Sequence, residues 1–318
     1  MTDKMRVSPF SLWIDEALSG WMLPLAGLAL LALAGLLYAA GFVTEETFAS
    51  VVVSVVGLGV ALYALRPALD AGRDEASRVL AAAAALLTAV ATVLPALRTV
   101  HPGDPIFAGA VGQVDDAISV PEGVSGPVRL LVSGKLADRG EPSVTFTIIG
   151  TKDPVDGRLE RTFGYARVGR GGRARVAHDH TADFYPAQIP PGTRELKLER
   201  LQGQLGSRLS VAVYREPISI AGGPWVLAAL ALLLAAVVDA RLGLKNDLAV
   251  ASGMAVAFGL LVTYNATPAG AAGPAVGGIL LGALSGALAG WIVGAVVRRF
   301  VPQARKRSVA RPNEASAA

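Results

Sequence analysis

The stretch Trp21–Phe42, WMLPLAGLALLALAGLLYAAGF, decides the fold class of this chain because it is apolar throughout and carries no charge. An α-helix rises about 1.5 Å per residue, so a run of this length crosses the roughly 30 Å hydrocarbon core of a bilayer. The apolar core of a secretory signal peptide is shorter and is followed by a clear small-residue cleavage site. We therefore predict a transmembrane anchor here.

Further apolar runs of the same kind follow at Phe48–Leu65, Val79–Leu97, Pro224–Val238, Leu248–Tyr264 and Pro274–Val297. Pro224–Val238 is short for a span, so we expect it to take extra length from Ile218–Gly223. The chain is 53% hydrophobic and 17% charged, whereas soluble domains carry about 25% charge. The sequence predicts a polytopic α-helical membrane protein with about six transmembrane helices.

The segment 99–219, between the third and fourth runs, alternates apolar and polar residues with the period of a β-strand. Val128, Leu130, Val132 and Leu136 alternate with the polar residues Arg129, Ser133 and Lys135. Val144, Phe146 and Ile148 alternate with Thr145 and Thr147. Turn sequences rich in Gly, Pro and Asp separate these stretches. We predict an inserted all-β domain of about seven or eight strands, a sandwich that is jelly-roll-like.

The distribution of basic residues predicts the orientation in the membrane, because cytoplasmic loops are enriched in Lys and Arg. The loops 43–47 and 265–273 contain neither residue. The other two short connections and the two ends hold Lys4, Arg6, Arg66, Arg73, Arg78, Arg241, Lys245, Arg298, Arg299, Arg305, Lys306, Arg307 and Arg311. We expect a multi-pass protein of the plasma (inner) membrane with both termini cytoplasmic and residues 99–219 extracytoplasmic.

This orientation divides the chain into five parts. They are a cytoplasmic N-terminal interfacial segment (1–20), transmembrane helices 1–3 (21–98), the extracytoplasmic β-sandwich domain (99–219), transmembrane helices 4–6 (220–297) and a basic cytoplasmic tail (298–318). The basic pI, about 9.5, follows from this topology, so we expect no nucleic-acid partner.

A glycine recurs at every fourth position of the last apolar run, at Gly278, Gly282, Gly286, Gly290 and Gly294. Glycine lets two helix backbones approach closely in lipid. We interpret this glycine stripe as a helix-packing seam, either against a helix of the same chain or against a second copy.

Two features of the predicted β domain are candidate binding residues. An arginine cluster that could meet an anionic ligand comprises Arg158, Arg161, Arg167, Arg170, Arg173 and Arg175; a solvated face paired with acidic residues is the alternative. His178 and His180 share one face of a predicted strand at a spacing that suits a metal. No third ligand is fixed by spacing, so we expect these histidines to be solvated or hydrogen-bonded and predict no metal.

The function is the least constrained property. The chain has no cysteine, no Ser elbow, no phosphate loop and no H-E-x-x-H motif, so no catalytic residue or cofactor is predicted. No Asp, Glu, Lys, Arg or His interrupts the six runs, which disfavours ion-coupled transport. We expect a structural or interaction protein whose outward domain binds a partner protein, envelope polymer or lipid. Its partners would be the bilayer and either itself or another envelope protein. The alternative is a channel or passive transporter with the glycine-rich helix at the pore or oligomer seam.

Overall fold

A computed structural model of the chain describes residues 22–69, 74–137, 141–168, 172–216, 222–268 and 270–301. The helices are α2 (Met22–Ala39), α3 (Glu45–Leu69), α4 (Glu75–Val100), α5 (Gly223–Leu242), α6 (Asp247–Asn265) and α7 (Ala272–Val297). The strands are β1 (Phe107–Val111), β2 (Ala117–Ser119), β3 (Gly126–Ser133), β4 (Ser143–Ile149), β5 (Val155–Val168), β6 (Gly172–His180), β7 (Ala182–Ile189), β8 (Glu195–Gln202) and β9 (Leu209–Arg215).

Within the described residues, six helices are long and apolar enough to cross a membrane, as the sequence predicts. The helix expected to be short, α5, gains its length from the C-terminal side: it begins at Gly223 and continues through Asp239 and Arg241 to Leu242. Of the expected extension, only Gly223 belongs to this helix, and Gly222 is its N-cap. Residues 217–221, which include most of the expected extension, lie outside the described part of the chain.

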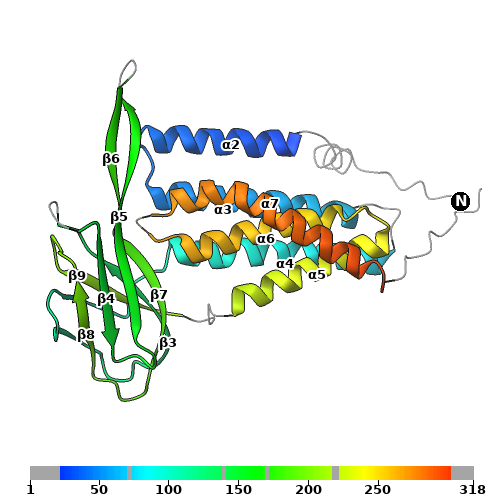
Figure 1. Cartoon of the computed structure of the whole chain (residues 1–318). Helices are drawn as coiled ribbons and strands as arrows, with labels where there is room; N and C mark the ends of the chain where they lie inside the picture. The colour runs from blue at the N-terminus through cyan, green and yellow to red at the C-terminus, as the bar shows by residue number, and fades with distance from the viewer. Residues whose placement is uncertain are drawn as a thin grey trace, which may run out of the picture.

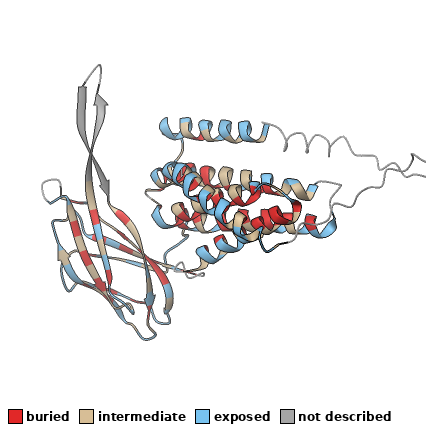
Figure 2. Cartoon of the chain, turned by 45° about the vertical axis from the view of Figure 1, so that its right-hand side comes forward, coloured by how far each residue is buried: buried red, intermediate tan, exposed pale blue. Residues whose placement is uncertain are grey.

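Helix α6 occupies the centre of the helix bundle and packs against α3, α4, α5 and α7. A hydrogen bond between the buried hydroxyls of Thr88 in α4 and Ser252 in α6 joins two of these helices, with 3.0 Å between the oxygens. Helix α2 packs mainly on α3 and leaves most of its surface uncovered by the rest of the chain (Figures 1 and 2). The bundle therefore consists of five closely packed helices and one peripheral helix.

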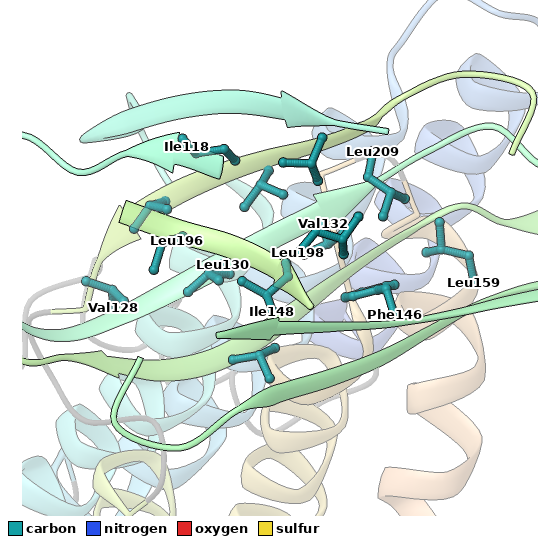
Figure 3. Close-up of a cluster of buried hydrophobic side chains, with 14 of the residues drawn as sticks. Ile118, Val128, Leu130, Val132, Phe146, Ile148, Leu159, Leu196, Leu198 and Leu209 are labelled. Carbon is teal, nitrogen blue, oxygen red and sulfur yellow. The ribbon is translucent and has the colours of Figure 1, made fainter. Parts of the chain in front are cut away.

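Two antiparallel sheets face each other across a single apolar core, in the orders β1-β9-β3-β7 and β2-β8-β4-β5-β6. Leu130 of β3, Phe146 of β4 and Leu198 of β8 are among the fully or almost fully buried side chains of that core (Figure 3). The sequence alternation arises because one face of each sheet is buried here. Strands β5 and β6 continue beyond the core as a long hairpin (Figure 1).

The β-sandwich lies at one end of the helix bundle, where α4 ends and α5 begins, whereas α7 ends at the opposite end (Figure 1). Helix α3 ends and α4 begins at that opposite end, and the connection from α5 to α6 also lies there (Figure 1). The sandwich and the bundle thus meet at one junction, close to the two points where the chain passes between them.

Candidate functional site

Arg129 lies at the centre of this junction. In β3 its neighbours Val128 and Leu130 are buried in the sandwich core, and Arg129 itself retains only 8% of its exposed surface. The Arg129 side chain is on the outer face of its sheet, which is exposed to water in an ordinary sandwich. Here the end of the helix bundle covers that position, so a charged residue is buried between two parts of the chain.

The guanidinium of Arg129 contacts residues from three other parts of the chain. Its Nη1 donates a hydrogen bond to Thr99 Oγ1 in α4 at 3.1 Å. Its Nε lies 3.9 Å from Glu216 Oε1, just after β9, and the guanidinium carbon lies 4.3 Å from the ring centroid of Phe184 in β7. The Thr99 hydroxyl is in turn 3.2 Å from the Thr263 carbonyl oxygen of α6. Arg129 therefore connects the sandwich to two helices.

Arg129 stays charged in this setting. Burial lowers the pKa of its guanidinium from the ordinary value of 12.5, and the neighbouring Glu216 carboxylate acts in the opposite direction. An arginine is effectively always protonated in proteins, so this direction does not neutralise it. A buried charge of this kind needs partners, and the Thr99, Glu216 and Phe184 contacts supply them.

A pocket of about 380 Å³ opens beside this arginine, and we call it the junction pocket. It is lined by Leu94, Pro95, Arg98, His101, Pro102, Gly103, Arg129, Tyr214, Arg215, Glu216, Pro224 and Leu227. Three of these residues are arginines and one is a glutamate. The apolar residues come mostly from α4 and α5, so the pocket has a basic part and an apolar part contributed by the helices.

Arg98 and Arg215 differ from Arg129 because both are exposed. Among the described residues, neither side chain forms an ion pair or side-chain hydrogen bond. Arg98 is also the only Lys or Arg in the sandwich-side turn of any of the six described helices. These two guanidiniums, one from the helix bundle and one from the sandwich, border the same pocket from opposite sides of the junction.

His101 forms another wall of the pocket and belongs to a small polar cluster. Its Nε2 lies 2.7 Å from Ser50 Oγ, and its Nδ1 lies 3.8 Å from Glu46 Oε2. The single hydroxyl proton of Ser50 also points at the Glu46 carbonyl oxygen, which can only accept, at 2.7 Å. Both 2.7 Å contacts are hydrogen bonds when the His101 Nε2–H donates to Ser50 Oγ and the Ser50 hydroxyl donates to the Glu46 carbonyl oxygen. This tautomer cannot deprotonate the serine, so the cluster ties α3 to α4 and does not form a nucleophilic triad.

The structure places the predicted glycine stripe against α6 of the same chain. Gly278, Gly282, Gly286, Gly290 and Gly294 are all buried. An added Cβ at Gly282 would meet the backbone of Phe258, and one at Gly286 would meet the backbone of Gly253. Close approach of two backbones is the reason for glycine at these positions. The stripe is covered by α6 and does not border the junction pocket.

Five of the six residues of the predicted arginine cluster lie in β5 and β6, and none of these five lines the junction pocket. Arg167 pairs with Arg173 in the strand register, and Arg175 pairs with Tyr165; their side chains lie outside the described part, as does Arg170 entirely. Arg161 Nη1 donates to the Ala137 carbonyl at 3.0 Å. Arg158 forms an ion pair with Glu160 at 2.6 Å.

A second groove, on the sandwich, includes Arg158 but does not suit an anion. Its charged lining residues are two basic ones, Arg158 and Arg200, and two acidic ones, Asp156 and Asp183. Tyr185, whose pKa burial raises to about 12, also lines it and accepts a hydrogen bond from the Arg158 backbone N–H at 3.2 Å. The groove is therefore polar and close to neutral.

The histidine prediction remains a prediction. Strand β6 contains both residues, with His178 paired to Thr162 and His180 paired to Glu160 in the register, but their side chains lie outside the described part. The described side chains contain no group of three potential metal ligands.

The sequence analysis did not predict that the residues of the junction pocket form a site. Arg129 reads as the outward residue of an alternating strand, and Arg98 and Arg215 as ordinary residues that end a helix and a strand. The one available signal is Arg98 itself. It is a basic residue at the predicted extracytoplasmic end of a span, whereas Lys and Arg are expected mainly at the cytoplasmic ends. Comparison of the chain with known protein families, curated proteins and solved structures gives no match.

Proposed function

We propose that this chain is an integral plasma-membrane interaction protein that binds an anionic ligand at the membrane surface. The β domain would lie outside the cytoplasm, and the six helices would anchor it. One observation carries this proposal: Arg98 and Arg215, which have no described ionic partner, line one pocket together with Arg129. Guanidinium groups without a carboxylate partner are suited to hold carboxylate or phosphate groups of a ligand.

The orientation in this proposal is supported by where the basic loops fall on the fold. The end of α3, the start of α4 and the connection between α5 and α6 lie at the bundle end away from the sandwich (Figure 1). Arg66 and Arg78 lie in the helices on either side of the first connection, Arg241 lies in the last turn of α5, and Lys245 lies in the second connection. Because Lys and Arg accumulate on the cytoplasmic side, the sandwich end would face outward.

The architecture of the outward domain supports a binding role. With β6 set aside, the two sheets run β1-β9-β3-β7 and β2-β8-β4-β5. This alternation of early and late strands between two sheets is the order of a jelly roll, an eight-stranded architecture of two Greek keys. Jelly rolls occur in many binding domains, but the fold alone does not specify a ligand. The junction pocket supplies the specific chemistry.

The channel alternative finds less support in the same geometry. Its basis was the glycine-rich helix α7, and Gly282, Gly286 and Gly290 of that helix lie directly against the α6 backbone. This contact favours a packing role for the stripe.

Thermal unfolding of the purified full chain in mild detergent would test anion binding. Sulfate, inorganic phosphate and soluble dioctanoyl phosphatidic acid would each be added to the wild type and to the double variant Arg98→Gln/Arg215→Gln. A ligand that binds only the folded state raises the melting temperature. We expect at least one of these anions to raise it in the wild type and not in the variant. Equal shifts in both proteins for all three anions would contradict the proposal.

A further inference from the structure

We infer that the ligand of the junction pocket is a lipid with a terminal phosphate group, with the phosphate at the arginines and the chain along α4 and α5. This inference rests on the proposed function and names its ligand class. It follows from the lining chemistry of the pocket, its depth relative to the apolar spans, its charge and its size.

The lining chemistry is that of an amphiphile site. Arg98, Arg129 and Arg215 form the polar part, while Leu94 and Leu227 lie on the helices that continue into the apolar bundle. Leu94 lies about one helical turn before Arg98 in α4. A ligand that satisfies both parts must therefore carry a charged group next to an apolar chain.

The depth of the pocket matches the headgroup region. The pocket lies where α4 ends and α5 begins, so its helix side adjoins two apolar spans of the chain. On the neighbouring side of α5, Trp225 stacks with Tyr264 of α6, with 6.1 Å between the ring centroids. Trp and Tyr concentrate at the membrane–water interface. At this depth in a bilayer, an exposed arginine such as Arg98 would lie at the level of the lipid phosphates.

The charge favours a phosphate monoester. Three arginines and Glu216 line the pocket, and Glu216 already faces Arg129 Nε at 3.9 Å. The arginines therefore exceed the acidic groups by two. A phosphate monoester carries about −1.5 to −2 charges near neutral pH and offers three acceptor oxygens. A diester with a neutral or zwitterionic headgroup would balance less of this charge.

The size agrees with a headgroup and the first part of its chain. The volume of about 380 Å³ is near the lower end of the range for small-molecule pockets, roughly 300–1,000 Å³. Complete acyl chains would not fit inside, so they would leave the pocket along the outer surfaces of α4 and α5.

Three probes separate the lipid from free phosphate. The full chain in mild detergent would be titrated with dioctanoyl phosphatidic acid, with dioctanoylglycerol, which lacks the phosphate, and with inorganic phosphate, which lacks the chains. Binding would be followed by native mass spectrometry and by the melting temperature. We expect the phosphatidic acid to bind about tenfold or more tightly than either other probe, because only it satisfies both parts of the pocket.

Two variants test whether the junction pocket is the site. Arg98→Gln/Arg215→Gln should weaken phosphatidic acid binding about tenfold or more, because it removes two charge-assisted contacts. Leu94→Trp should also weaken it, by filling the apolar part while leaving every arginine in place. The control Arg194→Gln/Arg200→Gln removes the same charge from exposed positions outside the pocket and should bind as the wild type does.

The outcomes distinguish the inference from the function on which it rests. Inorganic phosphate binding as tightly as phosphatidic acid, with the same dependence on Arg98 and Arg215, would overturn the lipid assignment and leave anion binding intact. Phosphatidic acid binding equally to all variants would mean adventitious lipid around the helices, and would overturn the inference. If no anion responds to the arginine variants, both the inference and the proposed function fail.

Discussion

At the scale of single residues, the junction depends on one buried charge. Arg129 donates to Thr99 and lies beside Glu216 and Phe184, so its replacement removes several contacts at once. We predict that Arg129→Met lowers the free energy of unfolding by about 3–5 kcal/mol, the usual cost of breaking a buried ion pair from one side. Thermal or denaturant unfolding in detergent measures this. The double variant Arg129→Met/Glu216→Gln should recover part of the loss; a double variant as unstable as the sum of both single variants would contradict the coupling.

A second residue-scale prediction concerns Asp116, which closes the turn between β1 and β2. Its Oδ2 accepts hydrogen bonds from the backbone N–H groups of Gly112 at 2.7 Å and Gln113 at 3.1 Å. These bonds, and to a smaller extent Arg208, hold the pKa of the carboxyl below its ordinary value of 3.8. The Asp116 carboxylate therefore stabilises the folded state fully above the unfolded-state pKa of this group. This stabilisation is lost as the pH falls through the lower folded-state pKa.

Asp116→Asn should accordingly lower the melting temperature near neutral pH. The difference between wild type and variant should shrink as the pH falls below the ordinary carboxyl pKa of 3.8 and through the lower folded-state pKa, where the wild-type carboxyl also becomes protonated. Melting curves of both proteins over this pH range provide the measurement. A difference that stays constant across the range would show that the carboxylate charge is not the source of the stabilisation.

At the scale of elements, the start of α6 depends on a carboxylate from the neighbouring helix α5. Asp239, fully buried near the end of α5, accepts hydrogen bonds from the backbone N–H groups of Leu248 at 3.2 Å and Ala249 at 2.7 Å. Asn246, at the N-cap position, makes no such side-chain bond. The first N–H groups of a helix need acceptors, and α5 supplies one for α6.

Gly286→Leu should disrupt the contact between α6 and α7. The new side chain would start against the backbone of Gly253, which cannot move as a side chain can. Overpacking typically costs about 1–3 kcal/mol and occasionally more, and we expect the upper end or beyond. Gly286→Ala should also destabilise, because its Cβ meets the same backbone atoms. The control Gly277→Leu lies on the same helix in open space and should have little effect.

The measurement for these variants is the melting temperature together with the mass of the detergent-solubilised particle. Because the stripe packs on α6 of the same chain, the melting temperature should fall in Gly286→Leu without a change in mass. A lower particle mass with an unchanged melting temperature would instead indicate a seam between subunits.

At the scale of the whole molecule, the fold places basic loops and the β-sandwich at opposite ends of the bundle. Single cysteines test this orientation cleanly, because the chain has none of its own. Ser125→Cys and Gly273→Cys are exposed positions at the sandwich end, and Lys245→Cys is exposed in the connection between α5 and α6. We predict that an impermeant maleimide labels the first two on intact cells or spheroplasts, and labels Lys245→Cys only after permeabilisation. Labelling of Lys245→Cys alone on intact cells would place the sandwich in the cytoplasm.

The sequence by itself determined the classes of structure in this protein. Uninterrupted apolar runs such as Trp21–Phe42 predict helices because a bilayer leaves no other way to satisfy the backbone. The alternation around Val128 and Leu130 predicts strands because successive side chains point to opposite faces. Both signals are local, so they can be recognised without knowing what packs against them. The recurrence of glycine in α7 is local too, and it indicates close helix packing.

The tertiary structure alone decided the partners of these elements and the candidate site. The glycines predict a seam, but only the fold identifies α6 as the helix that occupies it. Asp239 looks like the charged edge of a span, yet it is buried because α6 begins beside it. The junction pocket joins Arg98, Arg129 and Arg215, which are far apart in the sequence. Each is an unremarkable charge at the end or on the polar face of its own element, and the site exists because the end of the helix bundle and one face of the sandwich bring these charges together.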